Sequence, residues 1–430
     1  MNFEEIIKDN VLNETIFRKK YENGLDAYVL PKKGFSKSFA SLTVKYGSND
    51  SNFVSLGSDR PIKVPDGVAH FLEHKMFEKE YGSVFERFDK LGVSANAYTT
   101  NTHTSYYFIS TDNYYEALNI LLEFVQVPYF TDETVEKEKG IIIQELRMYN
   151  DDPEREIFNN LLNSMFIEHP VKIDVGGTVE SVRSIDKDVL YLCYNSFYKP
   201  DNMIFLSIGD VDPGKIFDYV EKRIVCKQQG EIKRIYSDEP DQIKESYIEK
   251  TMNVSMPLMI LGFKDISKET NTKLLLKKYV DVTISLEALF GKSSEIYSEL
   301  YNKGLITSNL GYEYEAELDY GFVLISCSTA SPQKVNEEIR EYIKTKSDVG
   351  IDEGEFMKAK RVIKGAVIKA FDSIETLGHF YNSFMVKGIN VFEYIDVINN
   401  TTLSEVNERW KSILDFDRAV LSVIKPEERI

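Results

Sequence analysis

Residues 70–74 read His-Phe-Leu-Glu-His, and no other stretch constrains the chemistry of this chain as strongly. In a helix, residues three and four positions apart share a face, so His70, Glu73 and His74 would point in the same direction. Two imidazole nitrogens form half of a zinc site. A carboxylate beside them can accept a proton from a water whose pKa the metal has lowered. The spacing therefore supplies two metal ligands and a base.

The neighbours of this motif predict a largely buried helix. The flanking residues are apolar: Val68, Ala69, Phe71, Leu72, Met76 and Phe77. Burying two histidines and a glutamate without partners would cost on the order of several kcal/mol. The alternative is a chance pairing on a solvated helix, but the whole chain has only 5 histidines. We therefore favour a metal site.

Length and composition set the broad class. A chain of 430 residues predicts two or more domains. Its net charge of −17 disfavours nucleic acid and anionic membrane surfaces as partners. Cys193, Cys226 and Cys327 are far apart, which argues against a disulfide scaffold and for a reducing compartment. Because no signal-peptide core or membrane-length apolar run is found, we expect a soluble, cytoplasmic protein.

The first half of the chain alternates strand and helix patterns around the motif. We expect an irregular or helical lead-in up to about residue 22 and a polar loop over residues 47–65. The remaining predictions are strands at residues 25–30, 37–46 and 202–209, two strands within 93–109, and helices at 81–91, 113–127 and 189–197.

A further helix is predicted from Thr131 to about residue 149, ending before Pro153. Glu138 and Glu145 lie seven residues apart on it, about two turns, and hence on one face. That face adjoins residues 141, 142 and 146, which we expect to be buried because they are Ile, Ile and Leu. Either carboxylate on such a face could complete a metal site with two histidines.

The second half repeats the first in outline. A polar stretch over residues 229–247 is the best candidate for a linker. Beyond it we expect strands at residues 257–263, 321–328 and 417–424 and helices at 280–290 and 352–368, in an order that echoes the first half. This predicts an N-terminal metal-binding domain over residues 1–228 and a homologous domain without metal over residues 248–430.

Three motifs together resemble those of the insulinase/pitrilysin zinc peptidases, an inverzincin family: His70-x-x-Glu73-His74, Asn96-Ala-Tyr-Thr99 and Glu138-x6-Glu145. The chain looks most like the short two-domain bacterial type, such as the YmfH-like zinc proteases. The resemblance spans nearly the whole chain. It implies an α+β fold of two homologous domains of the LuxS/mitochondrial-processing-peptidase-like metallohydrolase type. Each domain would be a mixed β-sheet with helices packed mainly on one face.

The resemblance also implies roles for individual residues. One zinc ion would be bound by His70, His74 and Glu145, with Glu73 as the general base and Glu138 as a second acid that supports catalysis without binding the metal. Asn96 and Ala97 would lie on an edge strand that pairs with an extended peptide substrate.

One segment departs from the family pattern. Members that act alone carry an Arg and, seven residues later, a Tyr around a Gly-Leu pair in the metal-free half. Aligned on Gly304-Leu305, these positions fall on Leu300 and Thr307. Loss of one oxyanion donor typically costs about 2.7–4 kcal/mol. We therefore expect a homologous partner subunit, in a heterodimer or homodimer, to supply the missing pair.

Other residues and other functions are alternatives to this interpretation. Tyr301, Tyr312 and Tyr314 could replace the missing Tyr, although loop tyrosines more often pack. His103 could border the site, but a polar strand residue is the favoured interpretation. The alternative functions are a non-catalytic, chamber-forming or peptide-binding subunit that retains zinc, and a small-molecule metallohydrolase. The intact His-Glu-His set argues against the first, because structural zinc sites usually have four protein ligands.

Overall fold

The computed structural model describes residues 5–9, 14–55, 58–225, 230, 232–307 and 310–427. The chain forms two compact units, neither of which is continuous in sequence. The first comprises Met1–Leu146, Ile173–Tyr236 and Ala370–Gly388, and the second comprises Arg147–Lys172, Ser237–Lys369 and Ile389–Ile430. The linker expected at residues 229–247 divides the chain into two sequence repeats, which are not the same as these two compact units. The position of the linker stays a prediction.

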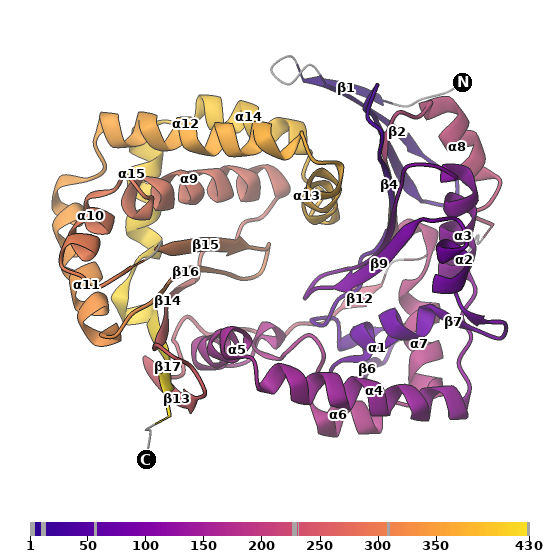
Figure 1. Ribbon diagram of the computed structural model, residues 1–430, viewed down its shortest axis with the longest axis horizontal. Coiled ribbons are helices and arrows are strands. Elements are labelled where there is room, and N and C mark those ends of the chain that lie inside the picture. Colours follow the sequence, from indigo (N-terminus) through magenta and orange to yellow (C-terminus); the bar gives the residue numbers. More distant parts are fainter. Residues whose placement is uncertain are drawn as a thin grey trace. The chain divides into compact units, whose positions relative to one another are not determined.

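A seven-stranded mixed sheet forms the centre of the first unit (Figure 1). Strands β3 and β11 are parallel and all other neighbours are antiparallel. In spatial order the strands are β1 (Glu5–Asp9), β2 (Glu14–Lys20), β3 (Asp26–Pro31), β11 (Met203–Gly209), β4 (Ser38–Val44), β10 (Thr104–Ser110) and β9 (Ser94–Thr99). Strand β9 therefore lies at an edge of the sheet, where its other side is open to pairing.

The N-terminal lead-in differs from the prediction. The segment expected to be irregular or helical contains strands β1 and β2. Ile16 is buried, and the guanidinium group of Arg18 forms two hydrogen bonds of 2.8 Å with the carboxylate of Asp26 on β3. The polar composition of this segment is typical of strands near a sheet edge, which keep much of their surface in solvent.

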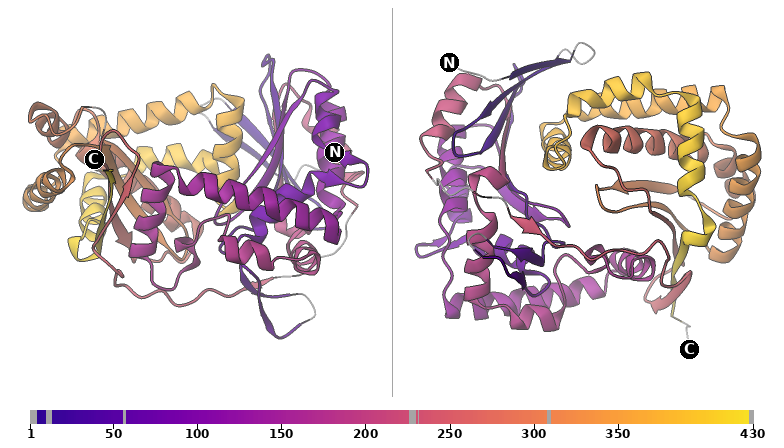
Figure 2. Two further views of the ribbon diagram at one scale, coloured as in Figure 1. Left: turned by 60° about the horizontal axis from the view of Figure 1, so that its bottom comes forward. Right: turned by 180° about the vertical axis from the view of Figure 1, so that it is seen from behind.

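Helices cover both faces of this sheet. Helix α3 (Tyr114–Gln126) packs on β10 and β4, and α8 (Pro213–Glu221) packs on β3. Helix α13 (Ile374–Val386) packs on β4 and β11 from the opposite face (Figures 1 and 2). Its Asn382 is buried, accepts a hydrogen bond from Ser41 and donates one to Ser105. Two small sheets complete the unit: β12 (Lys233–Arg234), β5 (Asn52–Val54) and β6 (Pro61–Lys63), and the β7 (Glu78–Lys79) and β8 (Gly82–Ser83) hairpin.

The second unit contains a five-stranded sheet: β13 (Tyr247–Met252), β17 (Ala419–Pro426), β14 (Leu258–Asp265), β16 (Gly321–Ser328) and β15 (Gly311–Ala316). Its spatial order and strand directions match those of β3-β11-β4-β10-β9 in the first unit, with one parallel pair followed by three antiparallel pairs. The strands also occur in the same order along the chain. The prediction of a repeated α+β fold is confirmed.

The two repeats exchange one helix each. Helix α5 (Pro153–Met165) follows α4 (Asp132–Asn150) in the first half of the chain, yet it packs on β14 and β17 of the second unit. Helix α13 follows α12 (Glu353–Ala370) in the second half and packs on the first sheet. Each of these two helices thus belongs to the unit built mainly from the other half of the chain, and it packs on that unit's sheet.

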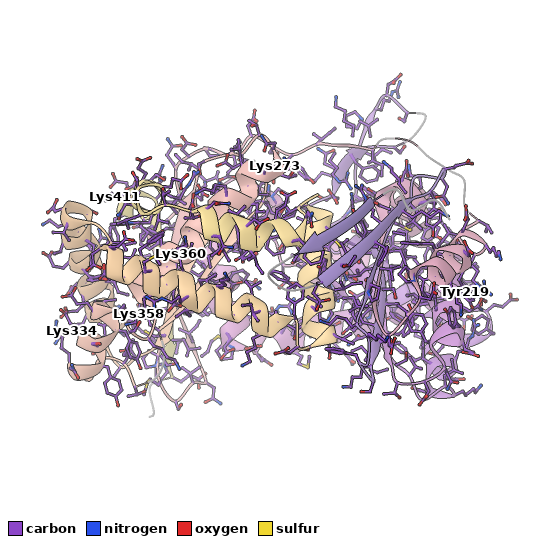
Figure 3. All side chains as sticks on the ribbon, turned by 90° about the horizontal axis from the view of Figure 1, so that it is seen from above. Tyr219, Lys273, Lys334, Lys358, Lys360 and Lys411 are labelled. Atoms are coloured by element: carbon purple, nitrogen blue, oxygen red, sulfur yellow. The ribbon has the colours of Figure 1, made fainter. Side chains whose placement is uncertain are left out.

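The second unit also contains α9 (Thr272–Phe290), α10 (Glu295–Asn302), α11 (Pro332–Val349), α14 (Val391–Asn400) and α15 (Leu403–Ile413), of which α9, α11 and α15 pack on strands of its sheet. Helix α9 begins earlier than expected, because Asn271 caps its N-terminus. Lys360 on α12 donates to the carbonyl groups of Asn399 and Thr401, 3.0 Å from each, at the C-terminal end of α14 (Figure 3). Trp410 is buried in this unit. In the described parts of the chain, no helix combines the length and apolar character required to cross a membrane.

Candidate metal centre

Helix α1 (Val68–Met76) presents the motif as the sequence predicts. Its apolar side is buried, with Val68, Ala69, Phe71, Leu72 and Met76 all at most 2% exposed. His70, Glu73 and His74 lie on the other side and are only partly exposed. The helix follows Gly67, whose φ of 89° favours glycine. A Cβ atom there would also lie 2.4 Å from the carbonyl oxygen of Gly176, so the loop around Gly176 fixes the start of the helix.

Helix α4 brings the two predicted acids to the histidines. One oxygen of Glu145 lies 3.9 Å from Nε2 of His70, and the other lies 3.5 Å from Nε2 of His74. On the same helix Ile142 and Leu146 are buried as expected. Ile141 was expected to be buried too, but it is 45% exposed. It lies about 100° around the helix from Ile142, which turns it out of the buried stripe.

The ligand atoms of His70, His74 and Glu145 all lie within 4.8 Å of one another. Zinc–ligand distances of 2.0–2.2 Å in tetrahedral geometry place two ligand atoms roughly 3.3–3.6 Å apart. Small side-chain movements would therefore bring the three groups onto one ion. Within the described ranges, no fourth His, Cys, Asp or Glu joins this group. Three protein ligands with an open position are typical of catalytic rather than structural zinc.

Glu138 interacts with the imidazole nitrogen of His74 that faces away from Glu145. Its Oε1 lies 3.0 Å from Nδ1 of the imidazole. When Nδ1 carries the proton and donates to Glu138, the lone pair of Nε2 points towards the group shared with Glu145. The structure thus places Glu138 beside a candidate ligand, outside the set of three.

The electrostatics of this cluster favour a cation. Burial raises the pKa of Glu73, and nearby Glu145 adds to this effect, while a hydrogen bond from Thr99 and the proximity of His74 oppose it. For His74, burial opposes the charged form, but the hydrogen bond with Glu138 and the surrounding carboxylates raise its pKa overall. Three carboxylates around two imidazoles in a partly buried space fit a divalent ion in charge as well as geometry.

Asn96 and Ala97 lie on the edge strand β9. Asn96 pairs with Tyr107 on β10, and Ala97 pairs with Tyr106. The backbone N–H of Ala97 donates to the side-chain oxygen of Asn96 at 2.8 Å. Helix α1 packs against the same strand, so β9 runs beside the candidate metal ligands. Pairing of this edge with a peptide remains a prediction.

The other three histidines lie outside the metal group. His103 is 4% exposed, and burial lowers its pKa to about 3. Its Nδ1 lies 3.0 Å from the hydroxyl of Thr100. In the second unit, Nε2 of His169 lies 3.3 Å from Asp319, and in the first unit His379 packs against Tyr107. All three have local structural contacts.

The segment aligned with the family's Arg-Tyr pair has one of its two key positions buried and the other, Thr307, exposed. Leu300 is fully buried in the second unit. Of the alternative tyrosines, Tyr314 donates to the carboxylate of Asp265 at 2.6 Å, and Tyr312 contacts Glu287. Tyr301 is exposed and stacks on Tyr297.

Sequence reasoning missed one contact of the candidate base. The hydroxyl of Thr99 donates to Oε2 of Glu73 at 2.7 Å. Thr99 stands three residues after Asn96 in the motif that carried the resemblance, but only the position of β9 beside α1 shows where its hydroxyl points.

A separate surface cavity of about 500 Å³ is lined by side chains of α2 (Phe85–Asp89), α3 and α8, including Tyr219 (Figure 3). Its two arginines already have partners. Arg87 pairs with Glu123 at 2.9 Å, and Arg223 donates to Asn119 while it stacks on the ring of Tyr219. We assign no ligand to this cavity.

The His-x-x-Glu-His helix is the signature of the inverzincin class of metal-dependent peptidases, and here it lies in a repeated α+β fold with Glu145 beside its two histidines. Comparisons with known proteins agree with this class. Residues 39–179 match the model of the insulinase family (peptidase family M16), and residues 184–363 match the M16 inactive domain. The chain belongs to the insulinase family, peptidase family M16, and to its short two-domain type.

Individual relatives cover almost the entire chain. The uncharacterized zinc protease YmfH of Bacillus subtilis (strain 168) is 41% identical over 97% of this chain and 98% of its own length. The crystal structure of an M16-like peptidase from Alicyclobacillus acidocaldarius is 35% identical, with a TM-score of 0.92 over 96% of this chain and 99% of that one. Pitrilysin, at 17% identity and a TM-score of 0.76, shares the fold; this chain covers 46% of it.

Proposed function

We propose that this protein is a zinc-dependent endopeptidase, or the catalytic subunit of one, that cleaves unfolded peptides or small proteins. The observation that carries the proposal is the convergence of His70, His74 and Glu145 beside Glu73. The names of its zinc protease relatives support the same conclusion.

The residues around the metal position have distinct tasks. When bound, zinc would supply a Lewis acid that polarises the scissile carbonyl and acidifies water. Glu73 accepts a proton from the attacking water and returns it to the leaving amine. Glu138 orients His74 by accepting a hydrogen bond from its Nδ1.

Strand β9 is the proposed substrate-binding element. An extended peptide can add to an edge strand through backbone hydrogen bonds, with little demand on its sequence. Asn96 and Ala97 on β9 would make these contacts. This mode favours unfolded substrates, because a folded chain has few free backbone groups.

We further propose that a homologous subunit completes the enzyme. Leu300 and Thr307 occupy the positions at which related enzymes carry an Arg-Tyr pair, and Leu300 is buried. The same observation supports a second candidate function, a chamber-forming or peptide-binding subunit that keeps zinc without catalysis.

The deciding experiment compares wild-type protein with Glu73→Gln, alone and mixed with a co-encoded homologue. We expect both forms to bind one zinc ion, because Glu73 is not one of the ligands. Only the wild type should cleave a quenched, unstructured peptide, and a chelator should abolish this cleavage. Equal turnover by Glu73→Gln would remove Glu73 as the base. No cleavage by zinc-loaded wild type in any mixture would favour the non-catalytic function.

A further inference from the structure

We propose that Thr99 is the positioning residue of the base, and that it assigns different tasks to the two oxygens of Glu73. The inference rests on the proposed function, because it concerns the residue to which that function gives the proton transfer. Its starting point is the 2.7 Å hydrogen bond from the Thr99 hydroxyl to Oε2 of Glu73.

The direction of this hydrogen bond follows from proton accounting. A hydroxyl has one proton to donate, and an ionised carboxylate can only accept. The other neighbour of the Thr99 hydroxyl is the hydroxyl of Thr104, at 3.2 Å. Thr104 has its own acceptor, the carbonyl oxygen of Tyr46 at 3.0 Å, so its proton is already used. Thr99 therefore donates to Glu73, the closer and charged partner.

This arrangement leaves Oε1 of Glu73 as the oxygen that receives the proton. Oε2 is held by Thr99 and is aimed at the sheet. Protonation of Oε1 does not remove the acceptor lone pairs of Oε2, so the same hydrogen bond is available before and after proton transfer. Glu73 can thus move a proton without losing its anchor.

The anchor is rigid because of its place in the sheet. Thr99 is the last residue of β9 and pairs directly with the fully buried Thr104 of β10. As a β-branched residue, threonine has restricted χ1 rotation. Asn96 and Ala97 lie on the same strand, so the element proposed to bind the peptide also fixes the base. A substrate that pairs with β9 would be placed in register with Glu73.

The test uses Thr99→Val, which keeps the shape but removes the hydroxyl, and Thr99→Ser, which restores it. Thr43→Val is the matched control, because Thr43 is a buried threonine of the same sheet whose hydroxyl contacts Ser105 at 2.8 Å. We expect Thr99→Val to lower kcat roughly tenfold to a hundredfold with little change in KM. Thr99→Ser and Thr43→Val should remain within about threefold of wild type.

A second readout does not depend on turnover. In crystals of the zinc-loaded proteins, Glu73 should keep one conformation in the wild type, Thr99→Ser and Thr43→Val, but leave its position in Thr99→Val. An unchanged Glu73 in Thr99→Val crystals would overturn the proposal. So would equal losses of kcat in Thr99→Val and Thr43→Val, since these would report a general effect of losing a buried hydroxyl.

A double variant, Thr99→Val combined with Glu73→Gln, separates this inference from the proposed function. If Glu73 is the base and Thr99 acts through it, adding Thr99→Val to Glu73→Gln should cause no further loss of residual activity. A further loss in the double variant would show that Thr99 acts elsewhere. If Glu73→Gln alone left turnover intact, the role of Glu73 would fail, whereas the crystals would still show whether Thr99 holds its side chain.

Discussion

Glu138 and His74 lie on different helices, and Oε1 of Glu138 is 3.0 Å from Nδ1 of His74. This contact leaves Nε2 of His74 facing the carboxylate of Glu145, 3.5 Å away. A residue outside the group of candidate ligands therefore orients one of its members. Such second-layer contacts fix the tautomer of a histidine ligand and raise its basicity.

We predict that Glu138→Ala lowers zinc affinity by roughly tenfold to a hundredfold, the usual effect of losing an outer-layer partner of a histidine ligand. Titration against a competing chelator measures this change. The matched control is Glu136→Ala on the same helix, because Glu136 is exposed and pairs with Lys139. An equal loss of affinity in both variants would show that Glu138 acts only through the general charge of α4.

Gly176 lies behind His70, and we predict that Gly176→Ala weakens zinc binding. A Cβ atom there would lie 2.8 Å from Cδ2 of Leu146 and 3.6 Å from Nδ1 of His70. The first contact is too short, so the loop or Leu146 must move, and His70 lies next to both. We expect a lower zinc affinity together with a loss of stability of about 1 kcal/mol, the low end for overpacking, because Cδ2 is the end of the flexible Leu146 side chain.

Gly140→Ala is the control for this variant. Gly140 is exposed within α4, and a Cβ atom there meets nothing within 4 Å. Alanine in place of glycine inside a helix should raise stability by about 0.5–1 kcal/mol without changing zinc affinity. Isothermal titration and thermal unfolding of both variants check the pair. Wild-type zinc affinity in Gly176→Ala would show that Leu146 moves aside without displacing His70.

Zinc removal should lower stability without unfolding the protein. The apolar side of α1 is buried in the first unit's core, so the helix does not depend on metal for its formation. Ligand binding to the native state alone contributes about 2.7 kcal/mol when free zinc is about 100 times Kd. A chelator should therefore lower Tm and leave the far-ultraviolet circular dichroism unchanged.

Two variants test whether the zinc-dependent rise in Tm comes from the group of candidate ligands. Zinc should raise the Tm of Glu73→Gln as it does that of the wild type, because Glu73 lies outside the group of candidate ligands. His74→Ala should lose the response. A full zinc-dependent Tm shift in His74→Ala would place the ion elsewhere in the chain.

Local pattern was sufficient to predict most of the residues that the structure brings together in the candidate metal group. The spacing of His70, Glu73 and His74 requires only that residues 68–76 form a helix, and their apolar neighbours bury its other side. The seven-residue spacing of Glu138 and Glu145 likewise requires only a continuous helix, and α4 contains both residues. By contrast, the spacing alone did not distinguish which glutamate faces both imidazoles. That depends on how α4 lies against α1, which is a tertiary property.

The exchange of α5 and α13 shows a different limit of sequence reasoning. An amphipathic helix must bury its apolar face, but the sequence pattern does not indicate which sheet or helix that face packs against. Leu161 on α5 is buried beside Phe322 and Val420 of the second sheet, although α5 follows α4 directly. Contacts between residues this far apart in sequence leave no local periodicity to detect.

His103 provides a prediction about pH. Burial lowers its pKa to about 3 in the folded protein, while nearby Lys387 and His379 further disfavour its charged form. An unfolded histidine has a pKa of about 6.5. Below that pH the unfolded chain therefore binds a proton that the folded chain does not, and folding stability must fall as the pH decreases from about 6.5 towards about 3.

Replacing His103 by Gln should remove this contribution. The free energy of unfolding of the wild type should fall by roughly 1.4 kcal/mol more than that of His103→Gln between about pH 7.5 and about pH 5.5. Denaturant unfolding in the presence of a chelator measures both proteins without the pH dependence of zinc binding. The comparison matters more than either absolute value, since His103→Gln can also lose the contact with Thr100 at every pH. Parallel pH profiles of the two proteins would mean that His103 becomes protonated in the folded state, which its burial in the turn from β9 to β10 opposes.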